Sequence, residues 1–204
     1  MTTAEPRIFT IGHSNHAVDD FVLLLRQHSI TAVADVRSTP YSGFAPQFNR
    51  EALKRELGKH GFKYVFLGRE LGARSGDPEC YENGRVQYAR LARTETFCTG
   101  IERVVKGARL ERIVLMCAEK DPLECHRTVL VARELTERGV VVGHILAGGL
   151  AESHGEAMRR LFDKLKLPHA DLLRSTEELI EVALARQEER IAYVDSALAA
   201  GAEG

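Results

Sequence analysis

Residues 115–127, with the sequence LMCAEKDPLECHR, concentrate side chains that could do chemistry. This stretch holds Cys117 and Cys125, two of the four cysteines of the chain. His126 and Arg127 follow the second cysteine directly. A cysteine thiolate beside a basic group is a nucleophile, whereas cysteine and histidine together are ligands for zinc. A third alternative is that the two cysteines only fill space in the core.

The residues before Cys125 predict the start of a helix. The Asp-Pro pair at positions 121 and 122 is typical of an N-cap followed by the first helical position. Cys125, His126 and Arg127 would then lie in the first turns of that helix, whose positive end stabilises a thiolate and binds anions. Nine residues lie between Cys117 and Arg127, which is too many for the anion-binding loop of a phosphatase or a rhodanese.

Zinc ligation is the competing interpretation of this stretch. Its ligands would be Cys117, Cys125 and His126, with His13 or Glu119 as a further donor. Neighbouring residues on one helical turn point about 100° apart, so Cys125 and His126 are poorly placed to bind the same ion. The sequence also contains no Cys-x-x-Cys motif. A thiolate or anion site without a resident metal or cofactor is therefore favoured, and zinc is the alternative.

Polar side chains also follow two other apolar runs of the chain. His13 and Ser14 come directly after the first run. Asp35 and Arg37 stand at the end of the second run. Open parallel sheets bind ligands beyond the carboxyl ends of their strands, so we expect these residues to share a pocket with Cys117. Helix capping by His13 and a structural ion pair between Asp35 and Arg37 are the alternatives.

Runs rich in isoleucine and valine alternate with segments of helical period over the first 149 residues. This alternation predicts an α/β fold, specifically a Rossmann-like three-layer α/β/α arrangement with a mostly parallel sheet of about five strands. The expected strands are residues 7–12, 31–36, 62–67, 112–118 and 140–146. The expected helices are residues 18–29, 49–61, 86–93, 96–105 and 122–139.

The pattern changes to helices alone after the glycine pair at positions 148 and 149. Ser175 and Glu178 have the spacing of a capping box at the start of a long helix. We therefore divide the chain into an α/β domain, residues 1–149, and a C-terminal helical extension, residues 150–204. The extension is expected to pack on the domain or on a second copy of the chain, which would give a homodimer.

Charge and cysteine content limit the class of protein. The net charge of −1 provides no general attraction to nucleic acid or to an anionic membrane. Residues 37–93, however, contain 11 basic and 6 acidic residues, and such a region suits an anionic ligand. The four cysteines are irregularly spaced, the start lacks the pattern of a signal peptide, and the longest uncharged stretch is 13 residues. We expect a cytoplasmic protein with reduced thiols that does not span a membrane.

Five motifs in order resemble the DUF488 family, bacterial and archaeal proteins of unassigned function. They are FTIGHSN, DVRSTPYS with QFN, YVFLGRELGAR, LMCAEKDPLECHR and GVVVGHI. The resemblance runs from about residue 7 to residue 145 and implies an α/β fold with one shared pocket, but no particular reaction. Its hallmark positions fall on His13, Ser14, Asp35, Arg37, Cys117, Glu119, Cys125, His126 and Arg127.

These observations favour an enzyme that acts on an anionic, nucleotide-like small molecule, although the sequence leaves open whether the protein is an enzyme. Arg37 and Arg127 would hold the anion. A non-catalytic nucleotide or nucleic-acid binding protein, using the basic residues 37–93, is the first alternative, and a metal-binding or dimerising interaction module is the second. The expected catalytic residues are Cys117, His13 and His126. The expected ligand-binding residues are Ser14, Asp35, Arg37, Glu119, Cys125 and Arg127.

Overall fold

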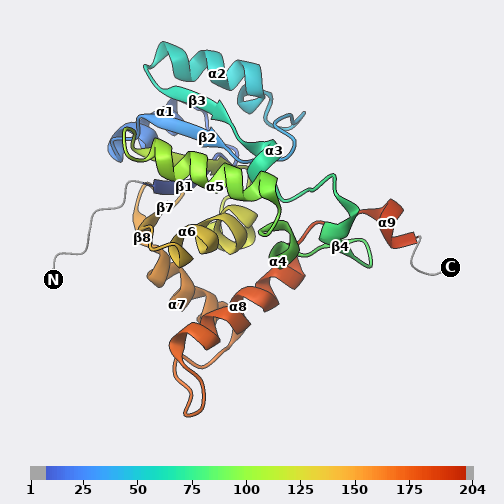
Figure 1. Ribbon diagram of the computed structural model, residues 1–204. Coiled ribbons are helices and arrows are strands. Elements are labelled where there is room, and N and C mark those ends of the chain that lie inside the picture. The colour runs from blue at the N-terminus through green and yellow to red at the C-terminus, as the bar shows by residue number, and fades with distance from the viewer. Residues whose placement is uncertain (1–7, 201–204) are drawn as a thin grey trace.

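A sheet of six strands, in the order β3-β2-β6-β1-β7-β8, forms the middle layer of the protein. The computed structural model describes residues 8–200 (Figure 1). Its strands are β1 (Ile8–Gly12), β2 (Ala32–Asp35), β3 (Lys63–Phe66), β6 (Ile113–Cys117), β7 (Val142–Ile145) and β8 (Ala151–Ser153). All pairings are parallel except that of β7 with β8. The predicted α/β fold with a mostly parallel sheet is confirmed.

Helices cover both faces of the sheet, because alternate residues of each buried strand point to opposite sides. Phe9 and Val114 face α1 (Val18–Gln27) and α2 (Arg50–Lys59) in one buried cluster. Ile8 and Ile113 belong to a second cluster, on the other face. The helices of that face are α5 (Glu95–Gly107), α6 (Arg133–Glu137), α7 (His154–Leu165) and α8 (Thr176–Ile191).

A small second sheet was not predicted from the sequence. β4 (Tyr81–Glu82) and β5 (Arg85–Val86) pair antiparallel across Asn83 and Gly84, which have φ angles of 48° and 73°. Two consecutive positive φ angles make a tight hairpin, and an Asn-Gly pair is its strongest sequence signal. The sequence predicts a helix over residues 86–93, which overlaps the end of β5. Three short helices are α3 (Gly68–Leu71), α4 (Tyr88–Leu91) and α9 (Ser196–Ala200).

The expectation of helices alone after position 149 is wrong for β8. This strand adds to the sheet beside β7. Gly149 has a φ of 87°, and its amide N–H donates to the carbonyl of Leu146 at 2.9 Å, which closes the turn. Three residues without an apolar run carry no periodic signal, so the sequence pattern could not reveal this strand.

The C-terminal helix α8 packs on the domain of its own chain. Leu179, Ala183 and Leu184 are buried in the core, and the Gln187 side chain donates a hydrogen bond to the carbonyl of Leu123 at 2.8 Å. A homodimer and the domain division at residue 149 stay predictions. No helix in the described part of the chain has both the length and the apolar character needed to cross a membrane.

Leucines hold the segment after Cys117 on the sheet, and Leu130 is 2% exposed. We expect Leu130→Ala to lower the free energy of unfolding by about 2–5 kcal/mol, because it removes buried methyl groups and leaves a cavity. Denaturant melts measure this change. The exposed Leu110, 88% accessible, is a matched control, and Leu110→Ala should change stability by less than about 0.5 kcal/mol. Equal effects of the two substitutions would show that the burial of Leu130 does not govern stability.

Candidate functional site

A cavity of about 280 Å³ opens at the carboxyl edge of the sheet, where β2 and β6 end. Cys117, Glu119, Cys125 and His126 line one part of it, and Arg37 also contributes. The predicted meeting of polar residues at this edge is therefore observed for five of the expected site residues.

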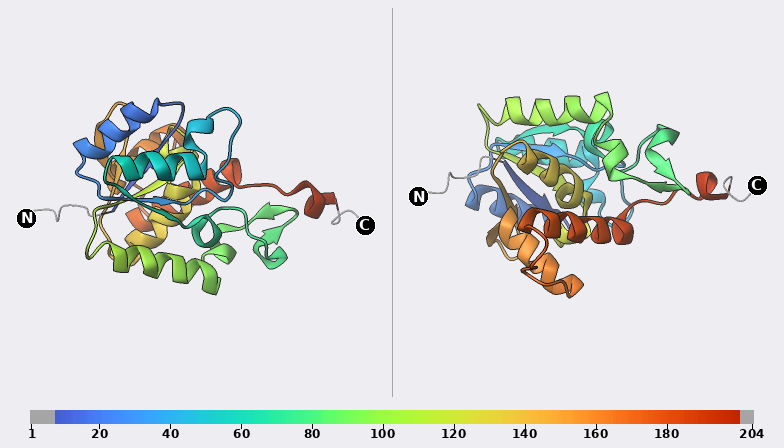
Figure 2. Two further views of the ribbon diagram at one scale, coloured as in Figure 1. Left: turned by 90° about the horizontal axis from the view of Figure 1, so that it is seen from above. Right: turned by 60° about the horizontal axis from the view of Figure 1, so that its bottom comes forward.

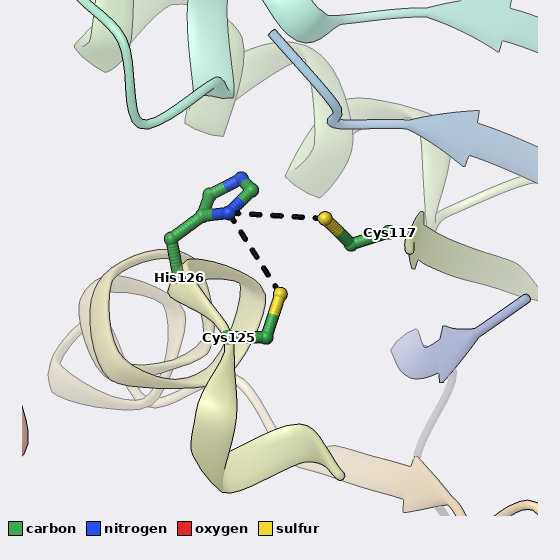
Figure 3. A group of neighbouring side chains, drawn as sticks. All are labelled: Cys117, Cys125 and His126. Atoms are coloured by element: carbon green, nitrogen blue, oxygen red, sulfur yellow. Dashed lines mark hydrogen bonds between the residues drawn. The ribbon is translucent and has the colours of Figure 1, made fainter. Parts of the chain in front are cut away.

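The two cysteines and His126 converge, as Figure 3 shows. His126 Nδ1 lies 3.8 Å from the Sγ atom of Cys117 and 3.8 Å from the Sγ atom of Cys125. All three candidate ligand atoms lie within 4.8 Å of one another. The expected divergence of Cys125 and His126 on one helical turn is wrong.

The reason is that the chain does not form one continuous helix after β6. A short 3₁₀ helix (Pro122–Glu124) is capped by Asp121, whose carboxylate accepts the amide N–H of Leu123 at 3.0 Å. Cys125 is then extended, with φ −142° and ψ 141°. A π-helical segment (Arg127–Ala132) leads into α6. The extended residue lets the Cys125 and His126 side chains point to the same place.

The imidazole of His126 is oriented by the backbone. Its Nε2 atom lies 3.0 Å from the carbonyl oxygen of Val36, which can only accept a hydrogen bond. We therefore assign the hydrogen to Nε2, which leaves Nδ1 facing the two thiols. Burial lowers the pKa of His126, but the Cys125 charge and hydrogen bond outweigh burial and leave it above the ordinary value. His126 is thus placed to carry a proton beside a thiolate.

Cys125 is the better candidate for the thiolate. Its Sγ atom accepts the backbone N–H of Arg127 at 3.5 Å, and its carbonyl accepts the amide N–H groups of Thr128 and Val129. Burial opposes ionisation, but the hydrogen bond from Cys117 and the charges of Arg127 and His126 place the pKa of Cys125 well below its usual range. A thiol at the N-terminus of a helix is stabilised as the thiolate in this way.

The sequence leaves open which of Cys117 and Cys125 is the reactive thiol, and the surroundings of Cys117 favour its protonated form. Its hydrogen bond to Cys125 and its burial raise the pKa of the Cys117 thiol well above the ordinary value. Cys117 then acts as a hydrogen-bond donor to Cys125. Glu119 lies on the other side, with Oε2 2.9 Å from Cys125 Sγ, and its pKa is raised by burial and by the neighbouring sulfur. The carboxyl group and Cys125 are positioned to share a proton.

Most N–H donors of the Arg37 side chain are used in hydrogen bonds within the protein. Nε and Nη2 donate to the two oxygens of Asp35 at 2.9 and 2.7 Å, and Nη2 also donates to the carbonyl of Phe48 at 2.8 Å. Nη1 lies 3.1 Å from His13 Nε2. Tyr64 adds a hydrogen bond to Asp35 at 2.7 Å. The structural ion pair is thus formed, and one N–H of Arg37 is left over for a ligand.

His13 and Ser14 are not among the residues that line the cavity. His13 Nδ1 lies 2.8 Å from the carbonyl of Ser14, its other nitrogen accepts from Arg37, and its ring stacks on Phe48 at 4.4 Å. Burial and the charge of Arg37 lower the pKa of His13 to about 4. The Ser14 hydroxyl donates to Asn15. The proton-carrying role expected for His13 has no support from this geometry, which instead makes it a positioning residue for Arg37.

Arg127 is also absent from the cavity lining and is fully buried. Its guanidinium donates to the carbonyls of Glu119 and Lys120, at 2.8 and 3.4 Å. The end of β1 comes close to the same loop, since a Cβ atom on Gly12 would lie 1.8 Å from the Glu119 carbonyl oxygen. Arg127 therefore fixes the loop that carries Glu119 and does not serve as the expected anion clamp.

Sequence reasoning missed several residues that line the cavity: Ser38, Thr39, Ala73, Arg74, Tyr88, Ala118, Glu124, Ile191 and Tyr193. Arg74 follows the third strand of the chain, so its place near a strand end was a signal that could have been used. Tyr193 had no such signal, because it stands far along the chain from every strand of the expected sheet.

One buried and one half-buried histidine, His13 and His154, predict sensitivity to acid. His13 and His154 both have pKa values lowered to about 4, mainly by burial, whereas an exposed histidine titrates near 6.5. Below about pH 6.5 these histidines are protonated in the unfolded chain but remain neutral in the folded chain. The free energy of unfolding therefore falls as the pH is lowered from about 6.5 to about 4. The loss is about 3 kcal/mol for each histidine at the acid end of this window. Urea melts from pH 7 to pH 4 measure it, and His154→Gln should flatten part of the slope. An unchanged slope in that variant would contradict the assignment.

Comparisons with known proteins give the family of the chain. The family model described as "Domain of unknown function DUF488" matches residues 17–133, which is more than half of the chain. No curated protein and no solved structure matches. The matched range includes the ion pair, both cysteines, Glu119, His126 and Arg127, but ends before the C-terminal residues of the cavity wall. The chain therefore belongs to the DUF488 family of proteins of unknown function.

Proposed function

We propose that the protein is an enzyme that uses the Cys125 thiolate to attack an anionic, nucleotide-like small molecule. The observation that carries this proposal is the position of Cys125 in the cavity, with Sγ 2.9 Å from Glu119 and 3.8 Å from His126. A nucleophile beside an acid and a base is the arrangement of covalent catalysis. Arg37 and Arg74 on the same cavity favour a negatively charged substrate.

The proposed role of each residue follows from whether its side chain holds or has lost a proton. The imidazolium of His126 stabilises the Cys125 thiolate before attack. When Cys125 Sγ forms a bond to the electrophilic atom, the leaving group departs with the bonding electrons and takes a proton from Glu119. Burial and the neighbouring sulfur raise the pKa of Glu119, which favours the protonated form that can donate to the leaving group. Water, giving its proton back to Glu119, then releases the second product and restores the thiolate.

A zinc site is the second candidate, and the corrected geometry supports it. Zinc binds sulfur at about 2.3 Å and nitrogen at about 2.0–2.1 Å in tetrahedral sites, which separates a sulfur ligand from a nitrogen ligand by about 3.6 Å. The two sulfur-to-nitrogen distances at His126 are both 3.8 Å. Cys117, Cys125 and His126, which all line the cavity, would hold the ion, and the ion would supply Lewis acidity there.

One experiment separates the two candidates. The rate at which iodoacetamide alkylates each cysteine is measured between pH 5 and pH 9, with and without a chelator, and the metal content is determined in parallel. The thiolate proposal expects Cys125 to react with a midpoint clearly below the ordinary value of about 8.5. An ordinary midpoint, or no reaction at Cys125 under either condition, would contradict it. Equimolar zinc and a thiol that reacts only after chelation would establish the zinc site instead.

A further inference from the structure

The last residue of α8 and the four residues that follow it, residues 191–195, form a strap along the β4–β5 hairpin. The amide N–H of Val86 donates to the carbonyl of Tyr193 at 3.0 Å, and that of Asp195 donates to the carbonyl of Gly84 at 2.7 Å. Val194 forms an antiparallel bridge with Arg85. Both views of Figure 2 show the C-terminal segment beside the hairpin. These contacts fix the strap with respect to the domain.

The strap supplies part of the cavity wall. Ile191 and Tyr193 both line the cavity that contains Cys125. The amide N–H of Tyr88, another lining residue, donates to the carboxylate of Glu188 at 2.7 Å, which ties the end of α8 to the same wall. All of the strap lies outside residues 17–133, the range that the family model matches. This part of the wall is therefore not set by the matched family region.

The Arg74 side chain stacks on the Tyr193 ring of this wall, and its N–H groups are free to donate hydrogen bonds. Its guanidinium carbon lies 4.4 Å from the centre of the Tyr193 ring, and its backbone N–H donates to the Ser38 hydroxyl at 3.1 Å. Among the described residues, the Arg74 side chain has no hydrogen-bond or ion-pair partner beyond this stacking contact. Stacking uses the face of the guanidinium and leaves the N–H groups on its edges free. Arg37, in contrast, has one free N–H.

The carboxylates of the cavity do not cancel this positive charge. Glu124 forms an ion pair with Lys164. Glu119 is hydrogen-bonded to Cys125, and burial raises its pKa. Arg74 thus remains the cation with the most unengaged donors on the described cavity wall.

We propose that Arg74, held by Tyr193, is the residue that recognises the anionic group of the substrate, a phosphate or a carboxylate. A planar guanidinium fixed by stacking binds such oxyanions through two parallel hydrogen bonds. The strap thereby determines specificity, since Tyr193 sets the position of Arg74 relative to Cys125. This inference rests on the proposed function, because it assigns the binding of the substrate that Cys125 attacks.

Two alkylating reagents of similar size test the inference without a known substrate. Iodoacetate carries a carboxylate and iodoacetamide is neutral, so the ratio of their rates at Cys125 measures attraction of an anion. A change in the ionisation of Cys125 alters both rates together and leaves the ratio unaffected. We expect Arg74→Gln and Tyr193→Leu to lower the ratio about tenfold, the effect of losing one charge-assisted hydrogen bond.

Two matched variants serve as controls. Tyr193→Phe keeps the ring and should keep the ratio within about twofold of the original protein, because stacking does not need the hydroxyl. Arg69→Gln removes the same charge from an exposed residue that does not line this cavity, and should also leave the ratio unchanged. Arg74 is itself exposed, so its substitution leaves the core intact.

The outcomes distinguish the inference from the function on which it rests. A ratio that falls in Arg74→Gln and Tyr193→Leu, but not in the controls, supports the inference. An unchanged ratio in Arg74→Gln, with Cys125 still reactive, overturns it and leaves the thiolate enzyme standing. A Cys125 that is inert to both reagents in the unaltered protein overturns the proposed function together with the inference.

Discussion

Replacing Cys125 by serine will slow the fastest thiol alkylation of the folded protein by about 30-fold at pH 7. Only the thiolate attacks the reagent, and a thiol with an ordinary pKa is about 3% ionised at this pH. Cys117 is ionised still less, because its hydrogen bond to Cys125 and its burial raise its pKa. Peptide mapping after short pulses of iodoacetamide will show which cysteine carries the label.

Substitutions of Cys117 provide the matched control for this prediction. Cys117→Ser keeps a hydrogen-bond donor beside Cys125 and should retain most of the fast reaction. Cys117→Ala removes the donor and should raise the pKa of Cys125, which slows alkylation near neutral pH. The assignment is wrong if the fast label in the unaltered protein maps to Cys117 and persists in the Cys125→Ser variant.

A second large effect is expected at Arg127. We predict that Arg127→Ala lowers the free energy of unfolding by about 3–5 kcal/mol, because the change breaks a buried hydrogen-bond network and leaves a void. The side chain is fully buried, and the carbonyls of Glu119 and Lys120 would lose their donor. Urea denaturation at neutral pH provides the measurement.

Arg69→Ala is the control, since Arg69 is exposed and its replacement should change stability by less than about 0.5 kcal/mol. A loss below about 1 kcal/mol in Arg127→Ala would show that other contacts hold the loop at Glu119. If that variant remains folded, its Cys125 should also react more slowly, because a positive charge beside the thiolate has been lost.

The fold could be predicted from the sequence because its signals are local. Residues 112–118 and 140–146 are apolar runs, and such runs identify strands buried on both faces whatever surrounds them. The capping box at Ser175 likewise depends on residues three apart, and it is formed at the start of α8. The site was predicted only as far as it follows from strand ends: Arg37 and Cys117 line one cavity as expected, whereas the convergence of Cys125 and His126 was not expected.

The parts that sequence reasoning missed depend on distant contacts. Asp121 caps a helix as expected, but the helix is interrupted at Cys125, where the extended backbone brings His126 and the thiols together. Nothing in the order of residues indicates that Arg127 turns toward backbone carbonyls instead of the cavity. Tyr193 meets Arg74 across more than a hundred residues of chain, and such a contact leaves no trace in local patterns.

The strap has a consequence for how the protein is made. Synthesis proceeds from the N-terminus, and domains can fold while later residues are still being added. Ile191 lies 66 residues after Cys125, so the thiols and the strands that position them leave the ribosome first. A nascent chain that stops before the strap would therefore carry Cys125 in a cavity that lacks the wall formed by Ile191 and Tyr193, and Arg74 would lack the ring on which it stacks. Under the proposed function, the part of the site that selects the substrate is therefore completed last, after Cys125 and its neighbours have been made.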